Sequence, residues 1–454
     1  MNNMLIKLLL CALSGILCAF SFHPFGWWPC MLIAWVPLLI ALKDIKPRNW
    51  FRFGFFQGMI TYSISLFWFY HIFRAGAVCL FMILALFTGI FSIIYGSTRS
   101  KIKNPFLDIL FVACVWTSIE FFRSEIYFLK FPWITTGSAI GVTYLTPVIG
   151  VYGISFLIYT ASLSMVRKKT IGYGSILSII LLLLGIFRPA PVAQSDNRAI
   201  TALAVQGDCL DIKQYLSLSD KISNGNPHII VWPEYAVPYD IRKKSPEQLK
   251  EIISFAQKNN ATIIFGTQTI TGLGIRDWKN TALIIDKTGI IGEYVKNRPV
   301  HFMNDGLAGK EAKPIATSLG TIGTPICFDC DYSDVARKMV EQGAELFTVP
   351  SYDAAHWSEV QHVQHADLFK LRASETGRWI IVATGSSVSQ IIDPHGKIHA
   401  SLKSFEEGTI CSVVELRNNK TVYVRFGWIL PWLCIVYSYL FPAVYFFIKL
   451  RSTR

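Results

Sequence analysis

Three side chains that end apolar, β-like runs have the chemistry needed for covalent catalysis. Glu234 follows the run IIVWP, where the end of a strand can bury a carboxylate and raise its pKa towards that of a usable base. Cys327 ends the run TIGTPIC, and a cysteine becomes nucleophilic when a nearby base or cation favours its thiolate. Lys296, in GEYVKNRPVHF, could supply that cation and later stabilise an oxyanion.

Each of the three residues has an ordinary alternative when it is taken alone. Glu234 would then be a loop glutamate, Lys296 a surface lysine and Cys327 an inert cysteine of the core. Cys327 and Cys330 form one C-x-x-C pair, but the sequence nearby lacks the further cysteines or histidines of a zinc site. The remaining cysteines show no repeated pairing, so we predict no disulfide framework.

Three histidines give a second candidate for chemistry. His362 and His365 are three residues apart, a spacing that could place both on one helix face as metal ligands, with His356 close by. No convincing third ligand motif accompanies them. We therefore interpret them as surface or supporting residues and predict no metal and no organic cofactor.

The composition indicates a membrane portion. Of the 454 residues, 52% are hydrophobic and only 16% are charged, although the net charge is +13. Between Asp196 and Arg425 there are 25 Lys and Arg against 26 Asp and Glu, so the basic excess lies in the loops of the apolar segments. This distribution is typical of membrane topology and argues against a nucleic-acid partner.

Apolar stretches long enough to cross a bilayer predict about eight transmembrane helices. They lie at about residues 4–22, 26–42, 53–73, 76–98, 105–122, 143–166, 170–187 and 427–448. With a cytoplasmic N-terminus, fourteen basic loop residues face the cytoplasm and four face outside, which favours this orientation. Few ionisable residues lie inside these stretches, and Glu120 is the chief exception.

A cleaved signal peptide or a lipidation box is the alternative for the first stretch. Its start is weakly basic, no small-x-small site follows cleanly, and Leu10 occupies the small-residue position before Cys11. We therefore interpret this stretch as a helix.

The polar region alternates β-rich runs, such as ATIIFGTQT and AELFTVPS, with helical patterns such as SPEQLKEIISFAQKN. This alternation predicts an α/β domain with its chemistry at strand ends. We expect residues 1–189 to form a membrane domain, 190–425 an extracytoplasmic catalytic domain, and 426–454 a last helix and short tail.

At this point the sequence resembles a known superfamily. VWPEYAVP, YVKNRPVHF and ICFD are similar to the glutamate, lysine and cysteine segments of nitrilases, in the same order. The stretches FHPFGWWPCMLIAWVPLL, WTSIEFFR, FPWITTG and GVYGISFL resemble the membrane segments of the apolipoprotein N-acyltransferase family, which also has seven helices before the domain and one after it. The resemblance spans nearly the whole chain.

The resemblance implies an αββα sandwich for the domain and a location in the bacterial inner membrane. Glu234 would be the general base, Cys327 the nucleophile and Lys296 the oxyanion stabiliser. The acyl donor would be a phospholipid, and the acceptor would be the N-terminal amine of a diacylated lipoprotein. The domain would face the periplasm, and both termini would be cytoplasmic.

The sequence departs from the family pattern in two segments. Where the family has a supporting glutamate after the lysine, this chain has Asn304, unless a one-residue shift brings Asp305 into that place. Tyr352 replaces an asparagine of the family, and Trp357 is a displaced tryptophan. Asp329, after the nucleophile, is a further supporting candidate.

We expect apolar and aromatic residues to form a mouth through which acyl chains reach the thiol, although core packing explains the same residues as well. The candidates are Phe302, Met303, Tyr352 and Trp357. Two other hypotheses stay open: a membrane-tethered amide or nitrile hydrolase, and a non-enzymatic membrane scaffold or transporter. Loss of function on Cys327 replacement would separate the enzymes from the third.

Overall fold

The chain divides into two compact units. In the computed structural model, the helical unit comprises Met1–Arg188 and Arg425–Arg454, and the α/β unit comprises Pro189–Val424. All residues are described except 1–2, 100, 189–197, 221–226, 275–276 and 453–454. The α/β unit therefore interrupts the helical unit before its last long helix.

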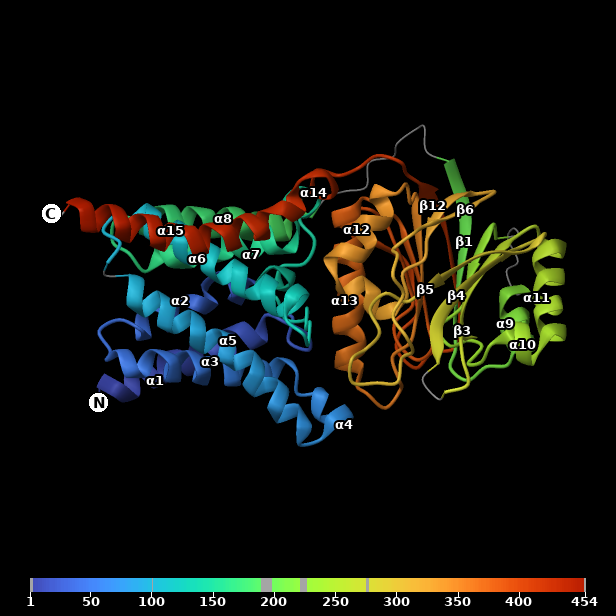
Figure 1. Ribbon diagram of the computed structural model, residues 1–454, viewed down its shortest axis with the longest axis horizontal. Coiled ribbons are helices and arrows are strands. Elements are labelled where there is room, and N and C mark those ends of the chain that lie inside the picture. The colour runs from blue at the N-terminus through green and yellow to red at the C-terminus, as the bar shows by residue number, and fades with distance from the viewer. Residues whose placement is uncertain (1–2, 100, 189–197, 221–226, 275–276, 453–454) are drawn as a thin grey trace. The chain divides into compact units, whose positions relative to one another are not determined.

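The helical unit consists of apolar helices joined by short turns (Figure 1). Its α-helices are α1 (Asn3–Phe20), α2 (Met31–Ala41), α3 (Trp50–Ser65), α4 (Phe69–Phe73), α5 (Gly76–Thr98), α6 (Pro105–Phe121), α7 (Thr146–Met165), α8 (Ile171–Ile186) and α15 (Leu430–Ser452). Its short helical turns are η1 (Trp28–Cys30), η2 (Pro47–Asn49), the π-helical η3 (Phe122–Ile126), η4 (Thr136–Ala139) and η6 (Gly427–Ile429).

Four helical segments of the described chain are long and apolar enough to cross a bilayer. They are Gly76–Thr98, Pro105–Ile126, Thr146–Met165 and Gly427–Tyr445. Three shorter apolar helices accompany them, at Met4–Phe20, Trp28–Ala41 and Ile171–Ile186. The total of eight spans stays a prediction.

Two of the expected continuous stretches are interrupted. The stretch 53–73 divides into α3 and α4, because the chain leaves the helix at Leu66. Within the stretch 143–166, Gly150 has φ +64°, a conformation that glycine adopts without the steric penalty of a side chain, and this kinks α7. Apolar composition alone does not reveal either break.

The α/β unit contains two six-stranded sheets. The first has the order β12-β1-β2-β3-β4-β5 and the second the order β11-β10-β9-β8-β7-β6. The strands are β1 (Arg198–Gln206), β2 (Ile229–Val231), β3 (Thr262–Ile270), β4 (Trp278–Asp286), β5 (Gly289–Val295), β6 (Ile315–Thr317), β7 (Gly320–Gly323), β8 (Leu346–Ser351), β9 (Ile380–Thr384), β10 (Gln390–Ile392), β11 (Ile398–Ser401) and β12 (Gly408–Leu416).

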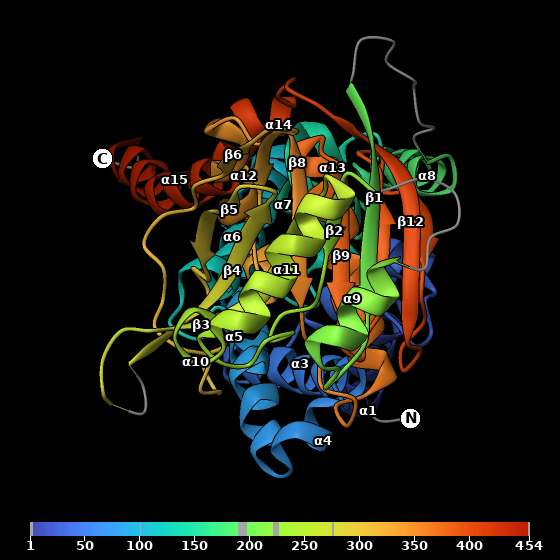
Figure 2. The same ribbon diagram turned by 90° about the vertical axis from the view of Figure 1, so that its right-hand side faces the viewer.

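Helices cover the outer face of each sheet. In Figure 2, α9 (Ile212–Asp220) and α11 (Pro246–Asn259) cross the first sheet, with α10 (Ile241–Lys244) beside them. In Figure 1, α12 (Ser333–Glu341) and α13 (Glu359–Thr376) lie beside the second. The remaining helices are η5 (Cys327–Asp331) and α14 (Val422–Arg425). The α/β class predicted from the alternating pattern is confirmed.

The parallel centre of each sheet brings several strand ends to one edge. β1, β2 and β3 pair in parallel in the first sheet, as do β7, β8 and β9 in the second. Backbone hydrogen bonds join the two edges, since the Glu234 amide donates to the Ser351 carbonyl at 3.3 Å and Gly207 to Thr384 at 3.3 Å. Residues that follow β2, β7 and β8 therefore meet.

The strand expected to run into Cys327 ends earlier. β7 stops at Gly323, and Cys327 begins the one-turn helix η5 instead. Pro325 between them has no N–H to continue a strand ladder, which accounts for the early end. Pro233 follows β2 in the same way and precedes Glu234.

Candidate active site

Glu234 lies in a tight turn directly after β2 and is only 2% exposed. The Pro233 carbonyl accepts a hydrogen bond from the Gly266 amide of β3 at 3.0 Å. A Cβ on Gly266 would lie 2.5 Å from the Glu234 Cα, so only glycine allows this close approach of the two backbones. The turn thus carries a carboxylate into the interior of the unit.

Lys296 follows β5 and neutralises two buried carboxylates. Its Nζ lies 2.8 Å from the Glu234 Oε1 and 2.8 Å from the Asp305 Oδ2. Asn280 of β4 completes the arrangement, because its Nδ2 donates to Glu234 at 2.6 Å and to Asp305 at 2.7 Å. Buried charges are tolerated when they are paired and hydrogen-bonded, as Glu234, Lys296 and Asp305 are.

Asp305, and not Asn304, occupies the supporting position beside the lysine. Asp305 is 6% exposed and also accepts hydrogen bonds from the Tyr235 hydroxyl and from the Val300 amide. Asn304 is exposed at the surface. The candidate role of Asn304 in this shell was therefore wrong, and the one-residue shift considered from the sequence is what the backbone adopts.

Cys327 is buried at the start of η5, and its Sγ lies 3.7 Å from the Tyr352 carbonyl at the end of β8. Its φ of +46° lies in the left-handed region, which costs a residue with a side chain roughly 1–2 kcal/mol. Such strain persists where the surrounding structure enforces it and is common at reactive residues.

The electrostatics of the site raise the pKa values of both Glu234 and Cys327. Burial raises the pKa of Glu234, although Lys296 and Asn280 partly oppose it. Burial, followed by the charge of Glu234, holds the pKa of Cys327 well above its usual range, while Lys296 lowers it. Burial would lower the pKa of Lys296, but Asp305 and Glu234 outweigh it and hold that pKa well above normal.

This balance suits proton transfer inside the site. A carboxylate with a raised pKa is a better proton acceptor than a surface glutamate, and a lysine that stays charged can stabilise negative charge. The thiol stays protonated until a base removes its proton.

Asp329 supports the loops that carry Lys296 and Cys327. One carboxylate oxygen accepts hydrogen bonds from the amides of Asn297 and Arg298, at 3.0 and 2.7 Å, and the other from Ile326 at 3.0 Å. Burial raises the pKa of Asp329 to about 6. Its contacts are structural, since they reach the residues next to the lysine and the cysteine.

The four residues expected to line the acyl-chain mouth differ in solvent exposure and in their contacts. Phe302 and Met303 are 49% and 37% exposed on the loop after β5. Tyr352 is half-buried and packs edge-on against Tyr235, with ring centres 6.1 Å apart. Trp357 is half-buried in the turn before α13. Of these four, Tyr352 also contacts Cys327, through its backbone.

The histidines separate into exposed and buried residues. His356 is exposed, and His365 is buried between two carboxylates. The Nε2 of His362 donates to the Ala354 carbonyl at 3.2 Å. Among the described residues, no group of three or more His, Cys, Asp or Glu could hold a metal ion.

Sequence analysis missed Asn280 and Tyr235. Both bond to the carboxylates of the site, and their hydroxyl and amide lie 2.9 Å apart. Asn280 is the third residue of β4, between Lys279 and Thr281, and as one of three consecutive polar residues near the start of the strand it carries no specific signal. Tyr235 follows the candidate glutamate directly, but a tyrosine beside a turn has no specific signal.

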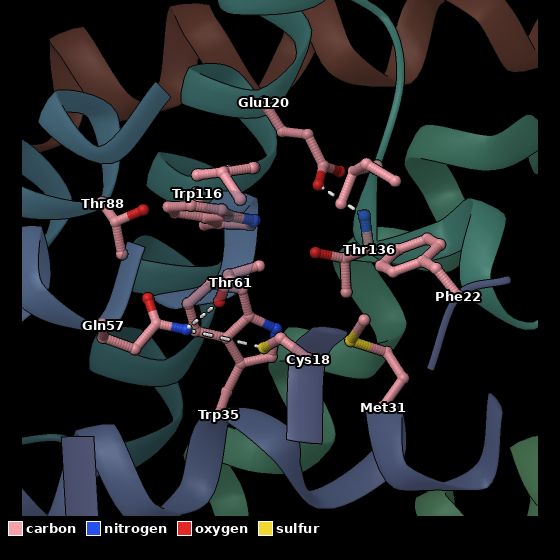
Figure 3. Close-up of a pocket in the computed structure, with 12 residues that line it drawn as sticks. Cys18, Phe22, Met31, Trp35, Gln57, Thr61, Thr88, Trp116, Glu120 and Thr136 are labelled. Atoms are coloured by element: carbon pink, nitrogen blue, oxygen red, sulfur yellow. Dashed lines mark hydrogen bonds between the residues drawn. The ribbon is translucent and has the colours of Figure 1, made fainter. Parts of the chain in front are cut away.

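A second polar cluster lies inside the helical unit, around a small cavity (Figure 3). Glu120 of α6 is buried and accepts a hydrogen bond from the Thr136 amide at 2.6 Å. Gln57 of α3 donates to the Thr61 hydroxyl at 3.0 Å and to the Cys18 Sγ at 3.6 Å. Glu120 is thus held by backbone instead of by a second charged side chain in this cavity.

Two family models match the chain in adjacent regions. Residues 14–164 match the apolipoprotein N-acyltransferase N-terminal domain, and residues 204–420 match the carbon–nitrogen hydrolase family. The α/β unit is therefore a carbon–nitrogen hydrolase domain, of the nitrilase-like class, in a chain with apolar helices that could cross a membrane.

Full-length relatives narrow the class. An apolipoprotein N-acyltransferase of Geobacter metallireducens is 26% identical, covering 96% of this chain and 95% of its own. That of Pseudomonas syringae pv. tomato is 27% identical, covering 94% and 95%. The chain belongs to the apolipoprotein N-acyltransferase family. It is accordingly an acyltransferase, and the hypothesis of a non-enzymatic membrane protein is not supported.

Solved structures resemble the α/β portion. An amidase of the nitrilase superfamily from Nesterenkonia AN1 is 20% identical and covers 52% of this chain and 96% of its own, with a TM-score of 0.41. A carbon–nitrogen hydrolase from Helicobacter pylori G27 is 19% identical and covers 52% and 93%, with a TM-score of 0.40.

Proposed function

We propose that the chain transfers an acyl chain from a membrane phospholipid, through a thioester on Cys327, to the N-terminal amine of S-diacylglyceryl-cysteine in lipoproteins. The observation that carries this proposal is the buried Glu234–Lys296–Asp305 arrangement, whose charges act on a buried cysteine thiol. Membership of the family supplies the substrate classes.

In the first half-reaction, Glu234 accepts the thiol proton as the Cys327 sulfur attacks the ester carbonyl of the phospholipid. The charge that develops on the carbonyl oxygen is stabilised by the Lys296 ammonium. When the tetrahedral intermediate collapses, the C–O bond breaks, the lysophospholipid leaves with the proton from Glu234, and the acyl group remains on sulfur.

In the second half-reaction, the lipoprotein amine attacks the thioester carbonyl and loses a proton to Glu234. The C–S bond then breaks, and the proton returns to the Cys327 thiolate. The product is an amide-linked acyl chain. The raised pKa of Glu234 favours both proton transfers, because the carboxylate must accept and return a proton in each cycle.

We also propose the membrane setting of this chemistry. The catalytic domain, residues 190–425, would face the periplasm as an αββα sandwich, between a membrane domain of about seven helices (1–189) and a last helix and tail (426–454). Both termini would be cytoplasmic in the inner membrane, in agreement with the excess of basic residues in the loops on that side. Phe302, Met303, Tyr352 and Trp357 would line the acyl-chain mouth.

The direct test is the mass of the Cys327 peptide after the detergent-purified full chain is incubated with phospholipid. We expect a hydroxylamine-labile acyl adduct that disappears when a diacylated lipopeptide is added, with an acylated lipopeptide as product. Cys327→Ala should abolish the adduct, whereas Cys209→Ala, which changes an exposed cysteine of the same unit, should not. Release of free fatty acid, or of ammonia from an amide, without acylated peptide would overturn the proposal.

A further inference from the structure

One buried histidine connects the segment that carries Cys327 to the strand end that faces it. His365, on α13, is 2% exposed. Its Nδ1 lies 2.9 Å from the Asp353 Oδ2, and its Nε2 lies 3.1 Å from the Asp331 Oδ1. Both carboxylates are buried as well, so the ring lies between two charges that have little access to water.

The two carboxylates belong to the two backbone segments at the nucleophile. Asp331 ends η5, the turn that begins with Cys327. Asp353 follows Tyr352, whose carbonyl lies 3.7 Å from the Cys327 Sγ. His365 bonds to Asp353 through Nδ1 and forms an ion pair with Asp331 through Nε2. A protonated His365 therefore connects the turn that carries the thiol to the strand end whose Tyr352 carbonyl accepts from that thiol.

We propose that His365 is a positioning residue for the Cys327 reaction, which holds these two segments in register and compensates the charge of Asp353 near the thiol. This inference rests on the proposed nucleophilic role of Cys327. His365 does not reach the thiol by any contact described above, so it acts through Asp353 and Asp331.

The charges around the ring agree with this role. Burial would lower the pKa of His365, but Asp353 and Asp331 outweigh it and raise that pKa to about 10, so the ring is an imidazolium at neutral pH. Asp353 has a lowered pKa: burial would raise it, but His365, Gln361 and His362 outweigh that effect. The negative charge of Asp353 raises the pKa of Cys327, after burial and Glu234, while Lys296 lowers it.

Loss of the imidazolium would thus leave Asp353 acting on the thiol without a positive partner. The Asp353 side chain would keep the hydrogen bond from the Gln361 Nε2, at 2.7 Å, so part of its position would survive. The consequence expected at Cys327 is a thiol that ionises at a higher pH.

The test is alkylation of Cys327 by iodoacetamide in the detergent-purified full chain, followed by peptide mass over about pH 7 to 11, because the pKa of Cys327 lies well above its usual range. Alkylation forms an S–C bond, breaks the C–I bond and releases iodide and the thiol proton. It needs no lipid, so it reports on the thiol even if the proposed acyl transfer fails. Fragment ions separate Cys327 from Cys330, which shares its tryptic peptide.

We expect His365→Gln to move the pH midpoint of alkylation up by about one unit, which slows the reaction at neutral pH about tenfold. Adding Asp353→Asn removes the uncompensated charge and should restore most of the rate. His399→Gln is the matched control, because His399 pairs with Asp393 at 3.0 Å in the same unit, on β11.

Two outcomes would overturn the inference. An unchanged midpoint in His365→Gln would show that the ring does not act on the thiol. A rate that falls equally at every pH, together with a lower melting temperature and no recovery in the double variant, would reduce His365 to a packing residue of α13.

Discussion

The two polar clusters of this chain contain the same kinds of side chain and use them differently. In the α/β unit, Lys296 and Asn280 bond to Glu234, and the charges of Glu234 and Lys296 act on Cys327. In the helical unit, Glu120 and Gln57 line the cavity that Cys18 also lines, and Arg123 follows Glu120 by three residues. In both units the carboxylate and the cation are buried to 2% exposure or less. Composition and burial therefore do not distinguish them.

The difference lies in where the hydrogen bonds go. In the α/β unit, the lysine and the amide both bond to the glutamate, so charged side chains face one another. In the helical unit, the Arg123 guanidinium donates to the backbone carbonyls of Phe131, Trp133 and Ile134, at 2.9, 3.2 and 2.9 Å. Glu120 accepts from the Thr136 amide.

The helical cluster thus fixes an irregular segment between η3 and α7, whose backbone would otherwise lack partners. The α/β cluster leaves its charges able to respond to a reacting group. Charged side chains that bond to one another, as Glu234 and Lys296 do, can take part in a reaction. Charged side chains that bond to backbone carbonyls and amides, as Arg123 and Glu120 do, support the fold.

The largest expected difference between the two clusters is in the rate of thioester formation when the glutamate of each cluster is replaced. Glu234→Gln removes the proton acceptor and should slow thioester formation on Cys327 by roughly 10²–10⁴-fold. Glu120→Gln, which keeps an acceptor for the Thr136 amide, should leave that rate nearly unchanged. Single-turnover mass spectrometry of the Cys327 peptide measures both rates, and an equal loss in the two variants would contradict the comparison.

The next expected effect is on stability, and here the helical cluster should show the larger change. Arg123→Gln leaves at least two of three buried carbonyls without their donor and should cost about 2–3 kcal/mol of stability. The melting temperature of the detergent-purified chain should fall, while alkylation of Cys327 stays unchanged. Arg52→Gln, at an exposed position on α3, is the control and should change neither. A catalytic defect in Arg123→Gln would assign this cluster a role in chemistry.

A smaller effect is expected within the catalytic set itself. Asp305 is one of the two carboxylates that hold the Lys296 ammonium, so Asp305→Asn should loosen the position of that ammonium and slow thioester formation on the order of tenfold. The control is Asn304→Asp, which adds a carboxylate one residue away at the surface. If Asn304→Asp changed the rate and Asp305→Asn did not, the assignment of the supporting carboxylate would be wrong.

That pair of residues also marks how far sequence could predict the site. The positions of Glu234, Lys296 and Cys327 at the ends of apolar runs could be predicted, because strand ends of an α/β domain are where side chains converge. The choice between Asn304 and Asp305 could not. It depends on the path of an irregular loop. Such a loop has no helical or strand periodicity in its sequence from which a shift of one residue could be predicted.

The remaining misses have the same origin. Asn280 reaches the carboxylates from β4, and Tyr235 reaches Asp305 from the turn after β2, so both contacts depend on which elements pack together. In the helical unit, the break between α3 and α4 occurs in an apolar stretch with no change of composition. Long-range packing and local backbone geometry, rather than residue type, decide these features.

The last expected effect is a pH dependence of stability from His365. Its pKa is about 10 in the folded chain against an ordinary value of 6.5, so the folded state binds this proton more tightly than the unfolded state. The resulting stabilisation is fully present below pH 6.5 and is lost as the pH rises towards 10. Asp353, with its lowered pKa, contributes in the opposite direction, and its stabilisation is lost in acid.

Melting temperatures of the unmodified chain and of His365→Gln between pH 6.5 and 10 measure this contribution. Other groups with raised pKa values, including Tyr294, also destabilise the folded chain as the pH rises, but they occur in both proteins and largely cancel in the difference. We expect that difference to narrow with rising pH. If the difference in melting temperature stayed constant over this pH range, His365 would not be protonated in the folded chain. The proposed pairing of an imidazolium with Asp353 and Asp331 would then be wrong.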